Sequence, residues 1–332
     1  MGIGDQIRLF PGMKEVEELI RSKFSSDARL LREIPEYLLD LGGKRVRPAL
    51  TLITAKMCGL PNLPQELLDV SAGIELIHMA TLLHDDIIDR SPVRRGKTAP
   101  HLKFGEPATL LTGDFLLVRA FSLCAHLDNF IVSETEEACV YLTEGEILEL
   151  PLSKQPCSVS ESLTIAEKKT AALFGLAAVS GAHVAEAGDE TEFALKRFGI
   201  ELGIAFQILD DVLDVVADEN LLGKRCGGDL VEQKPSLVNV LWLKSGSQEA
   251  TEVLLSETPP TEAQVSSALQ QLRSGADSRI IEEARAIADE KIAQANAALE
   301  QAVNSLRASS RLDEPSHQLL AGLIDYTVKR LR

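Results

Sequence analysis

The chain has 332 residues, a formal net charge of −16, and 45% hydrophobic against 25% charged residues. This composition fits one large or two ordinary globular domains with a sizeable core. The strong negative charge argues against a nucleic-acid partner, which would itself be a polyanion.

The ends of the chain and its cysteines predict a cytoplasmic protein. The opening MGIGDQIRLF lacks the apolar core of a signal peptide, and the closing KRLR carries no lipidation motif. The longest uncharged run, residues 170–185, is shorter than the ~18–20 residues that span a bilayer. An odd number of cysteines without metal-ligand spacing is typical of reduced thiols: Cys58, Cys124, Cys139, Cys157 and Cys226.

Helical patterns recur along the chain, separated by clusters of Gly and Pro. Residues 70–89 and 193–216 are apolar almost all round, as expected of helices in the middle of a bundle, whereas residues 278–306 form an amphipathic pattern. Strand patterns are almost absent. The sequence therefore predicts a single all-α domain over residues 1–332, with ten or more helices packed around a central cavity.

The first central helix follows a basic segment, GKRVRP at residues 43–48, and ends in the aspartate-rich sequence HDDIIDR. Residues four apart share a helix face. Asp85 and Asp89 therefore present two carboxylates in line, with Asp86 alongside. These three residues form the first aspartate triplet.

Basic residues surround this triplet. RRGK at residues 94–97 follows it, and residues 42–103 carry more Lys and Arg than Asp and Glu although the whole chain is acidic. Arg binds phosphate oxygens in a bidentate manner, and Lys adds a point charge. His78 lies about two turns before Asp85 on nearly the same face, as either a core residue or a ligand. This block is expected to bind a small anion.

The second central helix repeats the pattern in AFQILDDVLD, which gives a second triplet of Asp210, Asp211 and Asp214. A single triplet of this kind is usually a solvated acidic face. Two copies at the ends of apolar helices place repelling carboxylates beside a core, which is costly unless cations neutralise them. Carboxylates that leave room for water and phosphate suit Mg²⁺. The pair therefore predicts a magnesium site.

Nearly the whole chain resembles the trans-type polyprenyl diphosphate synthases. The motifs GGKRVRP, HDDIIDRSPVRRGK, HLKFGEPATLLTGD, GEILEL, KKTAALFG, AFQILDDVLD and DLVEQKPSL occur in that family's order and approximate spacing. The resemblance implies the isoprenoid synthase fold, a homodimer, and condensation of isopentenyl diphosphate with an allylic prenyl diphosphate. The short uncharged run separately predicts that there is no membrane span. GEILEL is more similar to long-chain members, which points to products longer than C20.

The resemblance also implies roles for individual residues. Three Mg²⁺ ions in the substrate-bound state would be held by the two triplets, with the middle aspartates in support: Asp85, Asp86, Asp89, Asp210, Asp211 and Asp214. The allylic diphosphate would be bound by Arg94, Lys169, Thr170, Gln207, Lys224 and Lys234. Isopentenyl diphosphate would be bound by Lys44, Arg47, His78 and Arg95. Direct roles in catalysis are expected for Asp85, Asp89, Asp210, Asp214, Lys169 and Lys224, although each lysine alone would pass for a surface residue.

One loop departs from the family pattern, which is close to DLxEGKxTLP. This chain reads DLVEQKPSLV, so that Gln233, Ser236 and Val238 replace Gly, Thr and Pro, while Lys234 is retained. The substitutions leave the charges of the loop unchanged and make its conformation an open question.

Three other functions compete with this hypothesis. A class I terpene cyclase also ionises a prenyl diphosphate, but it replaces the second DDxxD with a different metal motif and needs no isopentenyl site. A non-catalytic subunit of a heteromeric synthase typically lacks one triplet, and both are intact here. A helical Mg²⁺-dependent phosphohydrolase is the third alternative. No Ser/His/Asp or Cys/His catalytic set is recognisable.

Product length is expected to depend on Ala80 and Thr81, just before the first triplet. In the family these positions line the tunnel for the prenyl tail, and bulky aromatic residues there stop growth early. Both side chains are small here, which favours products beyond C20 rather than farnesyl or geranylgeranyl diphosphate. Alternatively, small residues at these positions only let buried helices pack closely, as Gly199 and Gly203 would on the second central helix.

Overall fold

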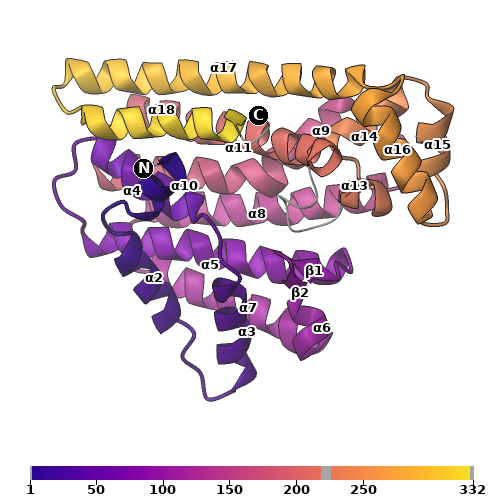
Figure 1. The fold of residues 1–332 in the computed structure, drawn as a ribbon. Helices are drawn as coiled ribbons and strands as arrows, with labels where there is room; N and C mark the ends of the chain where they lie inside the picture. Colours follow the sequence, from indigo (N-terminus) through magenta and orange to yellow (C-terminus); the bar gives the residue numbers. More distant parts are fainter. Residues whose placement is uncertain (1, 218–225, 330–332) are drawn as a thin grey trace. The chain divides into compact units, whose positions relative to one another are not determined.

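The structure is a computed structural model that describes residues 2–217 and 226–329 and is built almost entirely of helices (Figure 1). The first part of the chain contains α1 (Ile3–Arg8), α2 (Met13–Ser22), α3 (Leu30–Asp40), α4 (Val46–Met57), α5 (Gln65–Ile88), α6 (Pro100–Phe104) and α7 (Glu106–Cys124). The remainder contains α8 (Asn129–Leu152), α9 (Val159–Ala166), the π-helix η1 (Glu167–Ala171), α10 (Ala172–Val184), α11 (Asp189–Val216), α13 (Gly228–Val231), α14 (Leu237–Lys244), α15 (Gln248–Leu254), α16 (Glu262–Ser274), α17 (Arg279–Ala308) and α18 (Glu314–Lys329). The predicted all-α fold with ten or more helices is confirmed, whereas the central cavity stays a prediction.

A short hairpin follows α5. Its strands, β1 (Val93–Arg94) and β2 (Lys97–Thr98), pair antiparallel with Arg94 opposite Lys97. The two residues of the turn have positive φ, 51° at Arg95 and 75° at Gly96, as tight hairpin turns favour. Sequence analysis missed this hairpin because strands of this length carry no readable alternation.

The chain packs as two compact units. The first unit comprises Met1–Cys139, Leu173–Gly199 and Ala298–Tyr326. The second comprises Val140–Ala172, Ile200–Ala297 and the end of the chain from Thr327, so α8, α11, α17 and α18 contribute residues to both. The assignment of one domain over the whole chain stays a prediction.

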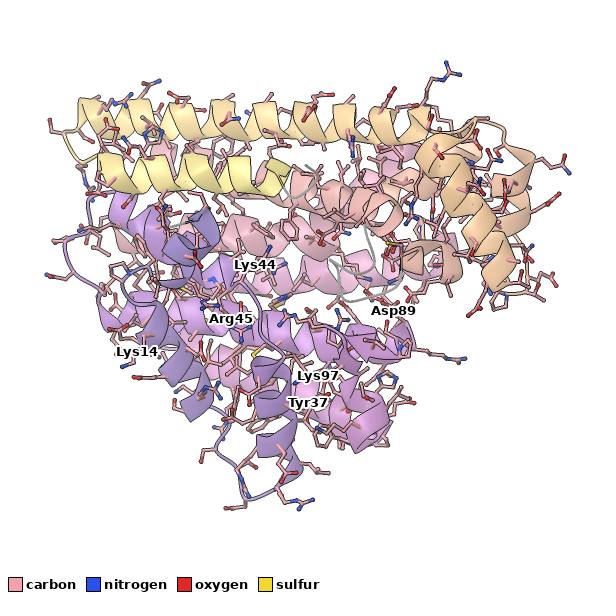
Figure 2. All side chains as sticks on the ribbon, viewed as in Figure 1. Lys14, Tyr37, Lys44, Arg45, Asp89 and Lys97 are labelled. Carbon is pink, nitrogen blue, oxygen red and sulfur yellow. The ribbon has the colours of Figure 1, made fainter. Side chains whose placement is uncertain are left out.

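In the first unit, α5 packs along α7 (Figure 1). Helices α2 and α4 also pack on α5, and α3 and α6 pack on α7. Most of α5 is buried, as predicted for a central helix, and Asp89 forms its C-cap. Tyr37 of α3 donates from its hydroxyl to the Thr98 carbonyl at 2.8 Å, and Figure 2 labels it beside Lys97. Helix α3 therefore fastens the hairpin that follows the first triplet.

In the second unit, the C-terminal part of α11 forms the core together with α14, α15, α16 and the start of α17. Ile208 and Val212 of α11 belong to the same buried cluster as Leu241 and Trp242 of α14. The Trp242 indole N–H donates to Asp277 Oδ2 at 2.7 Å, so the one tryptophan is both buried and satisfied. This core supports the helix end that carries the second triplet.

Two of the described helices, α5 and α7, are long and apolar enough by length and composition to cross a membrane. In α5, 72% of the most apolar window is buried inside the protein, and in α7 39%. A buried core helix meets the same length and composition criterion, and α5 is such a helix.

Candidate active site

The first triplet lies at the C-terminal end of α5. Asp86 is fully buried, and Arg94 Nε donates to its Oδ1 at 2.9 Å while Nη2 contacts the same oxygen. Burial alone would lower the pKa of Arg94, but the Asp86 contact and the charges of Asp85 and Asp89 raise it. The guanidinium therefore stays charged, and the hairpin holds it against the middle aspartate.

Helix α7 holds the same end of α5 through His84. The His84 Nε2 lies 3.2 Å from the Leu110 carbonyl oxygen and 3.5 Å from Asp114 Oδ1. Gly113 makes room for the ring, because a Cβ there would lie 2.1 Å from Nε2. Since His84 directly precedes Asp85, the contact fixes the turn that carries the triplet. Both partners lie in motifs quoted above, but only the structure connects them.

Arg45 ties the segment before α4 to the middle of α5. Its Nη1 donates to Glu75 Oε1 at 3.0 Å, and its Nη2 donates to the Leu39 carbonyl at 3.0 Å. Glu75 is 3% exposed; burial raises its pKa, opposed by the nearby arginines, above all Arg45. Sequence analysis passed over Arg45 although it lies in GKRVRP. Its neighbour Lys44 is exposed, and Figure 2 labels both residues.

Two of the arginines predicted to bind isopentenyl diphosphate, Arg47 and Arg95, act electrostatically on His78. Burial lowers the pKa of His78 well below its usual value, and the charges of four arginines, led by Arg47 and Arg95, lower it further. The imidazole is therefore neutral. Arg47 stacks its guanidinium 4.7 Å from the Phe174 ring centroid, while Arg95 lies at the exposed hairpin turn. The structure thus places His78 in one positively charged environment.

The second triplet lies at the end of α11, in the second unit. Thr170 Oγ1 donates to Gln207 Oε1 at 2.7 Å, and Gln207 Nε2 donates to Asp211 Oδ1 at 2.9 Å. The other Asp211 oxygen accepts from the Leu237 N–H at 2.9 Å. Burial raises the pKa of Asp211 to about 7; these two hydrogen bonds oppose the shift, and Asp210 and Asp214 add to it. Thr170, Gln207 and Asp211 thus form one chain of hydrogen bonds.

The start of α13 contacts Asp214. The Asp229 N–H donates to Asp214 Oδ2 at 3.0 Å, and the Gly227 N–H donates to the Asp214 carbonyl at 2.8 Å. Asp229 is a fourth carboxylate here: burial raises its pKa well above the usual value, and Asp214 and Asp211 raise it further. Sequence analysis did not single out Asp229, although it begins the quoted motif DLVEQKPSL.

Two predicted lysines lie among glutamates of the second unit. Lys169 Nζ lies 2.6 Å from Glu146 Oε2 and 3.0 Å from Glu149 Oε1. Lys234 Nζ lies 2.9 Å from Glu232 Oε2 and 4.0 Å from the same Glu149 oxygen. The sequence GEILEL therefore supplies the counter-ions of Lys169.

Lys169 projects from the π-helix η1, a wider turn that often marks functional sites. Gly145 of α8 lets this turn approach, because a Cβ there would lie 2.7 Å from the Lys169 backbone nitrogen.

The two residues predicted to set product length lie on α5. Ala80 is fully buried, and Thr81 donates from its hydroxyl to the His78 carbonyl at 2.9 Å. Lys224 lies outside the described residues.

Comparison with known proteins identifies close likenesses over most of the chain. The family model described as polyprenyl synthetase matches residues 28–272. Octaprenyl diphosphate synthase of Escherichia coli (strain K12) is 37% identical over 244 residues, 73% of this chain and 75% of that protein. Other matching relatives are named geranylgeranyl diphosphate synthase.

Solved structures extend the likeness to almost every residue. A decaprenyl diphosphate synthase from Rhodobacter capsulatus superposes with a TM-score of 0.87 at 30% identity, covering 99% of both chains. A polyprenyl synthase from Caulobacter crescentus CB15, complexed with calcium and isoprenyl diphosphate, superposes with a TM-score of 0.83 at 32% identity, covering 98% of this chain and 97% of that one.

Proposed function

Because the chain belongs to the polyprenyl synthetase family, whose relatives here are prenyltransferases, we propose that it condenses isopentenyl diphosphate with an allylic prenyl diphosphate. One observation supports this above the others: each unit pairs an aspartate triplet at a helix end with cationic side chains. Arg94 donates to Asp86 of the α5 triplet, and the charge of Lys234 acts on Asp229, whose N–H donates to Asp214. Diphosphates need both kinds of group, a metal-binding carboxylate set and fixed cations.

The carboxylates fit Mg²⁺. Buried carboxyl groups with raised pKa values, Asp211 and Asp229, lie among further aspartates, and clusters of this kind are stabilised by cations. Asp85, Asp89, Asp210 and Asp214 would hold the ions, with Asp86 and Asp211 orienting their neighbours. When bound, Mg²⁺ stabilises charge on a departing diphosphate. A set of three ions in the substrate complex follows from the family resemblance.

Each side chain then has a defined task. Arg94, Lys169, Thr170, Gln207, Lys224 and Lys234 bind the allylic diphosphate, and the fixed positive charges stabilise it as the carbon–oxygen bond breaks. Lys44, Arg47, Arg95 and the neutral His78 hold isopentenyl diphosphate so that its double bond attacks the allylic cation. A proton then passes to the released diphosphate, which acts as the base. The nucleophile is the double bond of isopentenyl diphosphate, so the reaction needs no side-chain nucleophile. Positioning two bound anions supplies the rest of the acceleration.

The product is a linear prenyl diphosphate longer than C20. The small side chains of Ala80 and Thr81 support this, as does the likeness to octaprenyl and decaprenyl diphosphate synthases. A farnesyl- or geranylgeranyl-length product is the alternative within the family.

The active form is a cytoplasmic homodimer without a membrane span or nucleic-acid partner. Four large apolar side chains of α7 are between 42% and 66% exposed: Leu110, Leu111, Val118 and Phe121. They lie within about 100° of one another on the helix, and an apolar face of this kind commonly marks a protein–protein interface.

Incubation with isopentenyl diphosphate, Mg²⁺ and farnesyl or geranylgeranyl diphosphate tests the proposal, with product mass as the readout. A ladder of prenyl diphosphates ending above C20 is expected. A cyclic hydrocarbon would instead identify a terpene cyclase, and release of phosphate alone would identify a phosphohydrolase. No turnover from a folded protein would identify a non-catalytic subunit.

A further inference from the structure

The turn after α13 contains a left-handed residue that is not glycine. Gln233 has φ of 53°; its N–H donates to the Leu230 carbonyl at 3.2 Å, and the next N–H, that of Lys234, donates to the Asp229 carbonyl at 3.0 Å. These two bonds define a Schellman motif, whose left-handed position is usually glycine because a Cβ there is strained. The family pattern has Gly at this position, so the chain keeps the glycine conformation with a larger side chain.

The Gln233 side chain compensates for this strain by anchoring the turn. It is 3% exposed, and its Nε2 donates to the carbonyls of Val253 and Ser256, each at 2.9 Å. Val253 lies in the last turn of α15, where helix carbonyls lack partners within the helix, and Ser256 directly follows the C-cap Leu255. Both amide hydrogens are thus used, and a glycine could supply neither.

The anchored turn carries Lys234. The Gln233 carbonyl accepts from the N–H of Lys154, in the turn after α8, at 3.4 Å. Asn239 Nδ2 donates to the carbonyls of Asp229 and Lys234, each at 3.0 Å. Backbone position at Lys234 is therefore set from several sides, and its ammonium comes to lie 4.0 Å from Glu149.

We propose that Gln233 is a positioning residue that fixes Lys234 for the diphosphate of the allylic substrate. Glycine can reach this turn without a side-chain contact but leaves it free to sample other conformations. In this chain the amide fastens the turn to α15, so the lysine is already in place before the substrate arrives. The proposal rests on the proposed function for the identity of the substrate.

A double-mutant cycle on steady-state kinetics is the first test. Gln233→Ala should raise the KM for the allylic diphosphate about tenfold and change kcat and the KM for isopentenyl diphosphate much less. Gln233→Gly, which relieves the strain but also removes the anchor, should act in the same direction. On a Lys234→Ala background, Gln233→Ala should raise the KM for the allylic diphosphate by less than about a further twofold. The effects of residues that act as one unit are not additive.

Gln248→Ala, on α15, provides the matched control. It is also a Gln-to-Ala substitution, but it removes a hydrogen bond to Glu252 instead of the contacts that hold the turn. It should leave all kinetic constants unchanged. Calorimetric titration with inorganic pyrophosphate in Mg²⁺ buffer measures the same double-mutant cycle as binding affinity, without turnover. Hydrogen exchange at the Lys234 backbone amide should be faster in Gln233→Ala than in wild type, and unchanged in Gln248→Ala.

The two proposals fail in different ways. A wild-type protein that makes no prenyl product overturns the proposed function, while the pyrophosphate cycle still decides the role of Gln233. Wild-type pyrophosphate affinity in Gln233→Ala, or an equal loss with and without Lys234, would overturn the positioning role. Unchanged exchange at the Lys234 amide would overturn it as well.

Discussion

The middle aspartates of the two triplets make different contacts within the protein. Asp86 pairs with Arg94, and Asp211 accepts hydrogen bonds from Gln207 and the Leu237 N–H. The middle aspartate of each triplet is thus engaged by the protein itself. The outer aspartates are the proposed metal ligands, and Asp214 among them also accepts from the Asp229 N–H. Asp85 and Asp210 are therefore informative positions for substitution.

Asp85→Ala or Asp210→Ala should lower kcat by orders of magnitude, each factor of ten being ~1.4 kcal/mol of barrier. The fold should survive, because removing one of several repelling carboxylates also relieves strain. Prenyl transfer in Mg²⁺ and thermal melts measure the two effects, and Asp289→Ala on the exposed side of α17 is the matched control. Near-wild-type turnover in either variant would contradict the metal assignment.

His183 gives the first unit a pH-dependent contact. Its Nε2 lies 2.6 Å from Asp128 Oδ2, its Nδ1 lies 3.2 Å from Glu192 Oε1, and its ring stacks on Phe130. Burial lowers the pKa of His183, but the two carboxylates outweigh it and raise the pKa above the usual 6.5. Because the folded-state pKa is raised, the stabilisation is fully present below the unfolded value and is lost as pH rises through the folded one.

The melting temperature of wild type should therefore exceed that of His183→Gln by more at about pH 6 than at about pH 9. Both proteins are compared by calorimetry at constant ionic strength. His317→Gln serves as the control, because the His317 imidazole faces the exposed carboxylate of Glu314 at 3.4 Å. A difference that is independent of pH would show that His183 acts by packing alone.

At the scale of helices, α5 and α11 were predictable because apolar runs with no polar face have clear ends. The run over residues 193–216 ends at Val216, as α11 does, and the amphipathic pattern from 278 to 306 corresponds to α17. The π-helix η1 was not predictable, because it depends on Gly145 of another helix. The left-handed φ of Gln233 depends in the same way on distant residues, the carbonyls of Val253 and Ser256, which no local pattern reveals.

Some features of the candidate site could likewise be predicted from the sequence, and others depend on tertiary packing. Charges and metal-ligand types could be inferred from sequence, and the roles of Lys169, Thr170 and Gln207 came from the family resemblance. Their mutual contacts could not be inferred, because Thr170 meets Gln207 only through tertiary packing of η1 and α11. Arg45, His84 and Asp229 were missed for the same reason. Gly199 does allow close packing, but against the backbone of Phe174 in α10.

Helix α5 should also set product length through Ala80. Ala80→Phe should shorten the products, because a ring on this helix would fill space that the growing tail needs. Product mass spectra from a farnesyl starter measure the change, and the rate of the first condensation shows whether the site is intact. An unchanged product spectrum would show that this position does not face the tail, and farnesyl diphosphate as the wild-type end product would overturn the long-chain proposal.

At the scale of the whole molecule, the exposed apolar face of α7 predicts self-association. Purified protein should sediment as a dimer at micromolar concentration. Val118→Glu and Leu111→Glu should shift it towards monomer, because both place a charge on the apolar face. Ala293→Glu, at an exposed position of α17, should leave the dimer intact. A stable and active wild-type monomer would refute the prediction.

The contact between His84 and Gly113 also constrains how this sequence can diverge. The two residues are separated by the hairpin and α6, yet a methyl group on one would occupy the space of the other's ring. Neither position can therefore change freely by itself. Among relatives, a side chain larger than glycine at the second position should occur together with a smaller residue in place of the histidine. Such paired substitutions would be the evolutionary record of this one helix contact.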